Sequence, residues 1–250
     1  MLIKTPEEIK KLRTAGHLLA GIFDLLLPQI KEGMTTAEID KMFENEIRKA
    51  GANPSCIGYA GFPATACISV NDQVTHGIPD DYKLKDGDIV DFDLVLDKDG
   101  YFADMSYTLK IGNVSKTAEK LVRVSKECLE IGISKVKPGN TLNNIGMAIE
   151  KHAKKNGFSV VYDYVGHFIG SEMHEEPEVL NYYAPDNNLV LQEGMVFCIE
   201  PMINEGTWKV ITKDDWDVRT ADGKLSSRFE HMVLVTKDSC EILTPLKFNK

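Results

Sequence analysis

The segment KEGMTTAEI at residues 31–39 returns in altered form as KPGNTLNNI at residues 137–145. Both copies are followed by the pattern Lys-x-Gly, at Lys49–Gly51 and at Lys155–Gly157, so an offset of 106 residues holds across separate segments. Two stretches that match at one offset are typical of a duplicated unit. The repeat therefore predicts two similar halves, each with a helix at the corresponding place.

A second pair of segments extends this repeat and selects two carboxylates. DGDIV at residues 86–90 resembles EGMVF at residues 193–197, at an offset of 107 residues. Six residues after the glycine of each segment stands an acid, Asp93 in the first and Glu200 in the second. The neighbouring Asp91 has no acidic equivalent in the second half. We therefore take Asp93 and Glu200 as equivalent candidate functional residues.

Length, charge and cysteine usage limit the class of protein. The 250 residues show no linker, which favours one domain over residues 1–250 with halves at about 1–115 and 116–250. A formal charge of −9 disfavours nucleic-acid binding, because such binding relies on clustered Lys and Arg. Five cysteines without a C-x-x-C pair are typical of a reducing cytosol. With no signal peptide or membrane-spanning stretch, we expect a soluble cytoplasmic protein.

The predicted elements alternate between groups of helices and groups of strands. Thr5-Pro6-Glu7-Glu8 is typical of a helix start, and apolar residues at helical spacing continue this helix to Pro28. Thr35 and Glu38 open a second helix in the same way. Further helices are expected at residues 118–136 and 142–156, and strands at residues 66–70, 89–96 and 101–111. This order predicts an α+β fold whose two halves share a sheet.

A hairpin between two of these strands brings two acids together. Asp99-Gly100 separates two runs of alternating apolar residues, which predicts a two-residue turn. In that register Asp104 faces Val95, so Asp93 and Asp104 are diagonal neighbours on one face, about 7–8 Å apart at the backbone. The alternative is that Asp93 and Asp104 lie on a solvent-exposed face of the sheet, but the strand residues around Asp93 are mostly apolar. Two buried carboxylates repel each other without a cation, so the hairpin predicts a metal site.

Three histidines lie in turn-rich contexts that favour function. His167 and His174 are seven residues apart in a Gly-containing stretch, and His76 begins the turn sequence HGIP. His17 and His152 lie on predicted helices without such a cluster. We expect these two to be ordinary hydrogen-bonded surface groups, which is the usual role of an isolated histidine.

Together these motifs resemble those of the bacterial type I methionine aminopeptidases over nearly the whole chain. They are HGIPDD at 76–81, the Asp93 and Asp104 hairpin, GH at 166–167, HEEP at 174–177, VLNY at 179–182, residues 195–202, KDDW at 213–216 and EH at 230–231. The resemblance implies the pita-bread fold, in which a central curved, mainly antiparallel sheet is backed by helices. It also implies removal of the initiator methionine when the next residue is small.

The resemblance further implies a centre of two divalent metal ions, drawn from Co, Mn, Fe and Zn. Its implied ligands are Asp93, Asp104, His167, Glu200 and Glu230. In the implied reaction a metal-bridging water or hydroxide attacks the scissile carbonyl, and Glu200 shuttles the proton. His174 would stabilise the oxyanion, and His76 would contact the peptide nitrogen. The implied partners are the N-termini of nascent polypeptides, met transiently at the ribosome by a monomeric enzyme.

By the same resemblance, a pocket for the methionine side chain would be lined by Cys56, Tyr59, Phe62, Cys67, Met173 and Trp216. Soft and aromatic groups suit a thioether, because sulfur contacts with rings are mildly favourable. His76 and His174 would complete the substrate contacts at the scissile bond.

Several residues beside the implied ligands depart from the family's pattern. Phe168 stands where the family usually has Gly, and Met105 and Met232 stand where Thr is common. Arg228, two positions before Glu230, resembles the Arg-x-Glu of proline-directed peptidases. Two alternatives therefore stay open, which are a pita-bread aminopeptidase of Xaa-Pro-like specificity and a non-catalytic relative that binds peptides or proteins.

Overall fold

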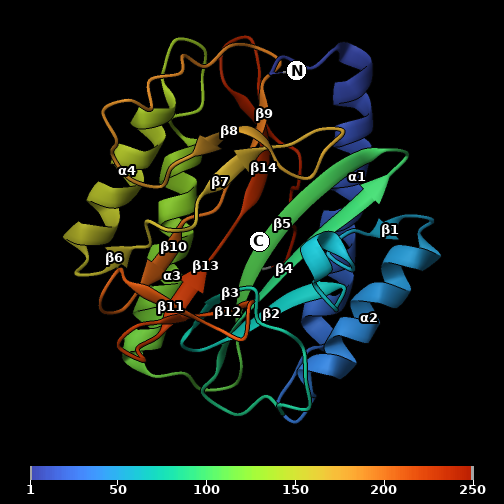
Figure 1. Cartoon of the computed structure of the whole chain (residues 1–250), viewed down its shortest axis with the longest axis vertical. Coiled ribbons are helices and arrows are strands. Elements are labelled where there is room, and N and C mark those ends of the chain that lie inside the picture. The colour runs from blue at the N-terminus through green and yellow to red at the C-terminus, as the bar shows by residue number, and fades with distance from the viewer. Residues whose placement is uncertain (1, 249–250) are drawn as a thin grey trace.

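The structure is a computed structural model that describes residues 2–248. Its long helices are α1 (Pro6–Leu26), α2 (Thr36–Lys49), α3 (Lys116–Ile133) and α4 (Leu142–Lys155), and two 3-10 turns are η1 (Leu27–Gln29) and η2 (Tyr59–Gly61). Figure 1 shows α1 and α2 on one side of the strands and α3 and α4 on the other. The helices of the two halves of the chain therefore enclose the strands between them.

The strands form several small antiparallel sheets. They are β1 (Asn53–Pro54), β2 (Ala66–Val70), β3 (Gln73–Thr75), β4 (Ile89–Lys98), β5 (Tyr101–Lys110), β6 (Ser159–Val160), β7 (Gly166–Phe168), β8 (Glu175–Val179), β9 (Val196–Ile199), β10 (Met202–Asn204), β11 (Val210–Lys213), β12 (Asp217–Thr220), β13 (Ser226–Arg228), β14 (His231–Val235) and β15 (Cys240–Ile242). One sheet joins β1, β4, β2 and β5, and another has the order β15-β14-β9-β7-β8. The predicted α+β class is confirmed, with one pair of helices contributed by each half.

The β4–β5 hairpin has the register that the turn sequence predicts. Lys98 pairs with Tyr101 and Asp104 pairs with Val95, on either side of the Asp99-Gly100 turn. Both turn residues have positive φ, 54° for Asp99 and 77° for Gly100, as a type I′ turn requires. The predicted diagonal relation of Asp93 to Asp104 follows from this register.

The two large sheets meet along β5 and the segment that leads into β14. Tyr107 and Phe229 form an antiparallel bridge, and the Glu230 backbone N–H donates to the Ser106 carbonyl at 3.1 Å. These backbone contacts tie the end of one half of the chain to the hairpin of the other. They place Glu230 close to Asp104, although 126 residues separate the two.

The helix starts follow the predicted capping signals closely. Thr5 and Thr35 each form a capping box, with Glu8 and Glu38 respectively. The helix predicted for residues 118–136 begins earlier, because Ser115 caps its first turn, and ends at Ile133. Beyond that point the Lys135 and Val136 N–H groups donate to carbonyls three residues back, so the chain continues in tight turns. Helix ends are therefore the least accurate part of the sequence prediction.

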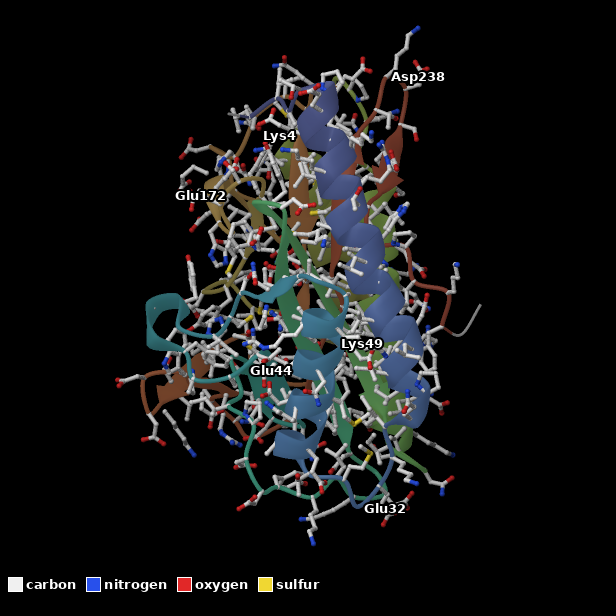
Figure 2. The ribbon with its side chains drawn as sticks, turned by 90° about the vertical axis from the view of Figure 1, so that its right-hand side faces the viewer. Lys4, Glu32, Glu44, Lys49, Glu172 and Asp238 are labelled. Atoms are coloured by element: carbon white, nitrogen blue, oxygen red, sulfur yellow. The ribbon has the colours of Figure 1, made fainter. Side chains whose placement is uncertain are left out.

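The core lies between the helices and the strands. Phe43 of α2 is fully buried, with its ring centroid 5.5 Å from that of Phe23 and 5.9 Å from that of Phe92. The opposite face of α2 carries charged side chains such as Glu44 and Lys49 on the surface (Figure 2), where Glu44 pairs with Arg48 at 2.8 Å. This division of apolar and charged faces fixes α2 against the β2–β4–β5 sheet.

The described residues contain no helix with the length and apolarity needed to cross a bilayer. The five cysteines are all free thiols, and four of them are buried.

Candidate active site

The five predicted metal ligands come from strands of both halves. Asp93 lies on β4, Asp104 on β5 and His167 on β7, while Glu200 directly follows β9 and Glu230 directly precedes β14. In the β9–β14 pair His231 faces Ile199, and in the β10–β13 pair Arg228 faces Met202. Glu200 and Glu230 lie between these two strand pairs, and the shared register places them opposite each other. Strand pairing thus brings the acids of distant segments to one point.

Three of the five candidate ligands, Asp104, His167 and Glu230, lie within 4.8 Å of one another, and Glu200 lies beside His167. The Nε2 atom of His167 lies 3.5 Å from Asp104 Oδ2 and 3.7 Å from Glu200 Oε1. One possible ligand atom each from Asp104, His167, Cys198 and Glu230 lies within 4.8 Å of the others, and all four residues are buried. Asp93 lines the same cavity. The geometry therefore offers a compact, mixed nitrogen and oxygen ligand set.

Buried oxygen atoms without partners show that this set fits a metal cation. Asp104 Oδ1 and Glu230 Oε1 are buried and accept no hydrogen bond from the described residues. The Nδ1 atom of His167 contacts the Phe168 carbonyl at 3.0 Å, which leaves Nε2 to face the carboxylates. An imidazole held through its other nitrogen is the usual state of a ligating histidine. The residues present therefore suit a divalent metal with oxygen and nitrogen ligands.

The electrostatics of the site also favour a bound cation. Burial raises the pKa of Asp104 and raises the pKa of Glu230 well above its usual range. Burial raises the pKa of Glu200 to about 7, although the nearby Arg228 and His167 oppose the shift. Burial lowers the pKa of His167, but contact with Asp104 and the charge of Glu200 outweigh burial and raise it to about 9. These carboxyls are costly to ionise together without additional positive charge.

The candidate ligands open into a cavity of about 440 Å³, a size typical of small-ligand sites. Beside them lies an apolar cluster, separate from the main core, formed by Cys56, Phe62, Ala64, Cys67, Val95 and Met173 with Trp216 packed against it. Tyr59, on the η2 turn, lies at the cavity rim and is 45% exposed. All six residues predicted to contact a methionine side chain therefore line one cavity.

His174 and His76 both line this cavity. The Nδ1 atom of His174 lies 2.7 Å from the Tyr59 hydroxyl, and its ring centroid is 4.3 Å from that of His167. His76 makes edge contacts with the rings of Tyr164 and Trp216. Burial lowers the pKa of both His76 and His174 to about 4, so both are neutral at pH 7. Each neutral ring has one donor and one acceptor nitrogen.

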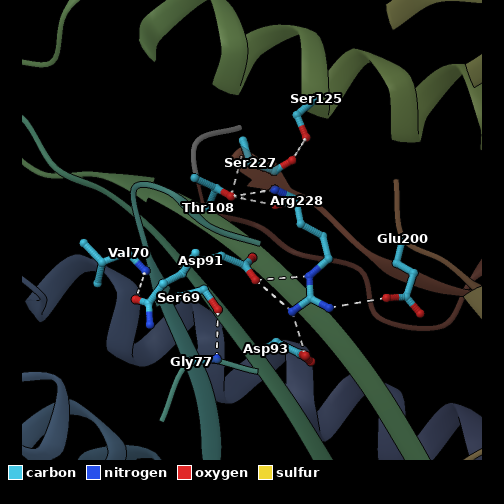
Figure 3. Close-up of polar contacts among 11 residues, drawn as sticks. Ser69, Val70, Gly77, Asp91, Asp93, Thr108, Ser125, Glu200, Ser227 and Arg228 are labelled. Carbon is cyan, nitrogen blue, oxygen red and sulfur yellow. Dashed lines mark hydrogen bonds and ion pairs between the residues drawn. The ribbon is translucent and has the colours of Figure 1, made fainter. Parts of the chain in front are cut away.

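The backbone at His76 is strained and tightly packed. Its φ of 57° is uncommon for a residue other than glycine, and such conformations cluster at functional sites. The next residue, Gly77, lies so close to β2 that a Cβ atom there would be 2.3 Å from the Ile68 carbonyl oxygen. The Gly77 N–H donates to the Ser69 hydroxyl at 3.2 Å (Figure 3). This close approach fixes the position of the imidazole.

Of the four residues that depart from the family's pattern, Arg228 lines the cavity and the other three do not. Phe168, Met105 and Met232 are fully buried in the main core. The ring of Phe168 packs against Phe197 with centroids 5.1 Å apart. None of the three lines the cavity. These larger side chains therefore fill space behind the ligands.

Two features of the site escaped the sequence prediction. Cys198 lies among the candidate ligands, and Asp91 forms a buried ion pair with Arg228 at 2.8 Å. Arg228 was identified only by its place two residues before Glu230. The signals available were an acid within an apolar strand and an arginine close to Glu230 in the sequence, but 137 residues separate Asp91 from Arg228.

Comparison with known proteins places this geometry in a family. A model of metallopeptidase family M24 matches residues 10–237. The chain belongs to metallopeptidase family M24. A methionine aminopeptidase from Salmonella typhimurium is 49% identical to this M24 chain over 245 residues, 97% of this chain and 93% of that protein. One from Clostridium perfringens is 46% identical over 99% of this chain and 100% of that protein.

Solved structures support the same assignment. The crystal structure of methionine aminopeptidase from Rickettsia prowazekii has a TM-score of 0.95 and 41% identity, and covers 98% of this chain and 100% of that one. A prolidase from Pyrococcus horikoshii shares the fold at a TM-score of 0.81 and 22% identity, over 99% of this chain and 65% of that one. The predicted pita-bread fold and the resemblance to type I methionine aminopeptidases are confirmed. The chain is a metallopeptidase by family, hence a hydrolase.

Proposed function

We propose that this M24 chain is a methionine aminopeptidase that removes the N-terminal methionine of nascent polypeptides when the next residue is small. The observation that carries the proposal is the position of the apolar cluster, which opens into the cavity that the candidate metal ligands line. Relatives at 46–49% identity over nearly the whole chain are named methionine aminopeptidases. We further propose that it acts as a monomer in the cytoplasm, with nascent chains met transiently at the ribosome.

Two divalent cations are proposed to bind at Asp93, Asp104, His167, Glu200 and Glu230. The four carboxylates of this set carry a formal charge that two divalent cations balance. A cation of this kind lowers the pKa of water and polarises a carbonyl oxygen. Predominantly oxygen ligands with one imidazole suit Co, Mn, Fe and Zn alike.

The chain's own residues position the substrate and move its protons. Glu200, whose pKa is about 7, is suited to take a proton from water and return it to the leaving amine. His174 lines the cavity as a neutral ring. In the tautomer that we propose, Nδ1 accepts from the Tyr59 hydroxyl 2.7 Å away, and Nε2–H donates to a developing oxyanion. His76, held by its strained backbone and two aromatic rings, contacts the substrate peptide nitrogen.

The apolar cluster selects the side chain of the first residue. Two thiols, a thioether and two aromatic rings provide polarizable contacts for an unbranched methionine, with the Phe62 and Trp216 rings 5.1 Å apart at their centroids. The α-amine of the substrate would lie on the Asp93 side of the cavity. A free amine at that position restricts cleavage to the end of a chain.

Release of the first residue from three tripeptides tests this assignment. We expect the purified, metal-loaded protein to release methionine from Met-Ala-Ser much faster than leucine from Leu-Ala-Ser, and to leave Ala-Pro-Ala intact. Cleavage of the prolyl peptide alone would assign the protein to the proline-directed branch, in line with the Arg228-x-Glu230 pattern. A metal-loaded protein that cleaves none of the three would instead support the non-catalytic peptide-binding alternative.

A further inference from the structure

Lys4, which lies just before α1, forms a buried ion pair with the residue that follows His174. Its Nζ atom lies 2.5 Å from Glu175 Oε2, and the two side chains are only 3% and 13% exposed. Glu175 is the first residue of β8 and lines the same cavity as His174. Figure 2 shows Lys4 and Glu172, a residue of the loop between β7 and β8, at the same end of the molecule. The N-terminal segment therefore contacts the immediate neighbour of the proposed oxyanion donor.

The backbone of Lys4 is held against the segment that leads into β9. The Lys4 N–H donates to the Gly194 carbonyl at 2.8 Å, and Ile3 forms an antiparallel bridge with Met195. A Cβ atom on Gly194 would be 2.9 Å from Ile3 Cγ2, so the two segments lie in close contact. Because β9, β7 and β8 belong to one sheet in that order, the lysine side chain reaches from the start of β9 to the start of β8.

Gly170 provides the space in which this ion pair forms. Its position is fixed by the Phe102 N–H, which donates to the Gly170 carbonyl at 3.0 Å. A Cβ atom on Gly170 would lie 2.3 Å from Glu175 Oε1 and 2.3 Å from Lys4 Nζ. The backbone of Gly170 is not in the left-handed region, so an alanine there would meet the ends of these two side chains without backbone strain. The two charged groups thus meet over a glycine that leaves them just enough room.

Regular strand pairing does not extend to His174. The four residues before Glu175 form a run of bends, without helix or strand. The β7–β8 pairing is irregular next to them, since Phe168 pairs with Glu175 but His167 pairs with Glu178. A ladder is disrupted where its register shifts, and the direction of nearby side chains changes there. The side chain of Glu175 is therefore an important restraint on the backbone that carries the His174 ring.

We propose that Lys4 and Glu175 are positioning residues, whose ion pair fixes the start of β8 and thereby holds the His174 ring in place for the developing oxyanion. A buried ion pair often adds little net stability compared with apolar side chains of similar volume, so its main effect is expected on geometry. A displacement of about 1 Å caused by a change far from the chemistry can cost about 10²-fold in rate. This inference rests on the proposed function, because it supports the role proposed there for His174.

Two variants break the ion pair in different ways. Lys4→Met removes the charge, while Gly170→Ala keeps both charges and fills the space between them. With saturating Mn²⁺, each should lower kcat for Met-Ala-Ser by about 10- to 100-fold with little change in KM, because an oxyanion contact acts mainly in the transition state. Arg13→Met is the matched control, since Arg13 pairs with Glu241 at 2.6 Å and neither residue lines the cavity. Its kcat should be unchanged.

A double-mutant cycle with His174→Ala separates positioning from general damage to the protein. If Lys4 acts through His174, adding Lys4→Met to His174→Ala should slow the reaction by less than about twofold further, because the ring that Lys4 positions is already absent. A further loss as large as that in the unchanged protein would overturn the proposal.

The environment of the His174 ring can be followed without catalysis. When histidine is labelled with ¹³C at Cε1, the Zn²⁺-loaded protein has one labelled position for each of its six histidines, and His174→Ala assigns one resonance. In Lys4→Met and Gly170→Ala this resonance should shift or broaden, while those of His17 and His152 stay in place. An unmoved His174 resonance in both variants would overturn the proposal. Circular dichroism and thermal unfolding check the fold, and Gly170→Ala decides if Lys4→Met does not fold.

Failure of this inference is distinguishable from failure of the proposed function. If the unchanged protein releases methionine from Met-Ala-Ser and both variants keep its kcat, only the positioning role of the Lys4–Glu175 pair is wrong. If the unchanged metal-loaded protein releases no methionine, the proposed function is wrong, and the His174 resonance alone then decides whether the ion pair positions the ring.

Discussion

Replacement of His174 by Ala tests the proposed oxyanion contact without removing a candidate metal ligand. His174 directly precedes β8, and its ring lies between the Tyr59 hydroxyl, 2.7 Å from Nδ1, and the ring of His167. Burial lowers the pKa of His174 to about 4, so the ring is a neutral donor at pH 7. The substitution removes that donor and leaves the strands that hold the carboxylates unchanged.

The expected loss is large and falls mainly on kcat. Removal of one donor to a developing oxyanion costs about 10²–10³ in kcat, or about 2.7–4 kcal/mol of transition-state stabilisation. Tyr59→Phe removes only the neutral hydrogen bond that orients the ring, a net loss of about 0.5–1.5 kcal/mol, or about two- to twelvefold. Because Tyr59 is 45% exposed, the lower part of that range is expected. Both variants are assayed by methionine release from Met-Ala-Ser at saturating metal.

His152→Ala is the matched control for His174→Ala. His152 lies on α4, contacts Glu127 at 2.8 Å and does not line the cavity. Its replacement should leave kcat within twofold of the unchanged protein. The reasoning is refuted if His174→Ala retains more than a tenth of the original kcat with its full metal content, or if the His152 control is equally slow.

Three further predictions concern the metal, the pocket and the core. Burial raises the pKa of Glu200 to about 7, so this carboxyl is increasingly protonated as pH falls. Metal affinity should therefore fall between pH 8 and pH 6, by up to about tenfold per pH unit for each proton that the metal displaces. Calorimetry in buffers of different ionisation enthalpy counts those protons, and a pH-independent affinity contradicts the prediction. Trp216→Ala opens the apolar cluster and removes contacts to the substrate side chain, so kcat/KM for Met-Ala-Ser should fall at least about tenfold. A variant with the same kcat/KM as the unchanged protein would exclude Trp216 from the pocket. Phe43→Ala removes a fully buried ring that packs on Phe23 and Phe92. The free energy of unfolding, measured in urea, should fall by about 3–5 kcal/mol. A loss below about 1 kcal/mol would mean that this part of the core is not tightly packed.

Local signals in the sequence predicted local structure well. The Asp99-Gly100 turn set the register of β4 and β5, and with it the relation of Asp93 to Asp104. Capping residues located the starts of α1 and α2, because each capping box is formed within four residues. The end of α3 was predicted less well, since apolar periodicity continues to Val136 although the helix ends at Ile133 and tight turns follow. The division into halves near residue 115 stays a prediction.

Long-range contacts could be predicted only where a motif was already familiar. The resemblance selected six pocket residues that the structure gathers around one cavity, although their spacing alone is typical of ordinary packing residues. The Asp91–Arg228 pair was missed because β4 and β13 belong to different sheets, and contact between two sheets has no local signature in the sequence. The assignment of catalytic and ligand roles to individual residues stays a prediction.

The most direct test of the account is the dependence of methionine release on bound metal. The metal-stripped protein is titrated with Mn²⁺, and free methionine from Met-Ala-Ser is measured beside the metal content per chain. We predict that release is absent without metal and rises in step with the metal bound at the buried carboxylates. A stripped protein that keeps its full rate, or a fully loaded protein that releases no methionine, would contradict the assignment of this centre as the site of the reaction.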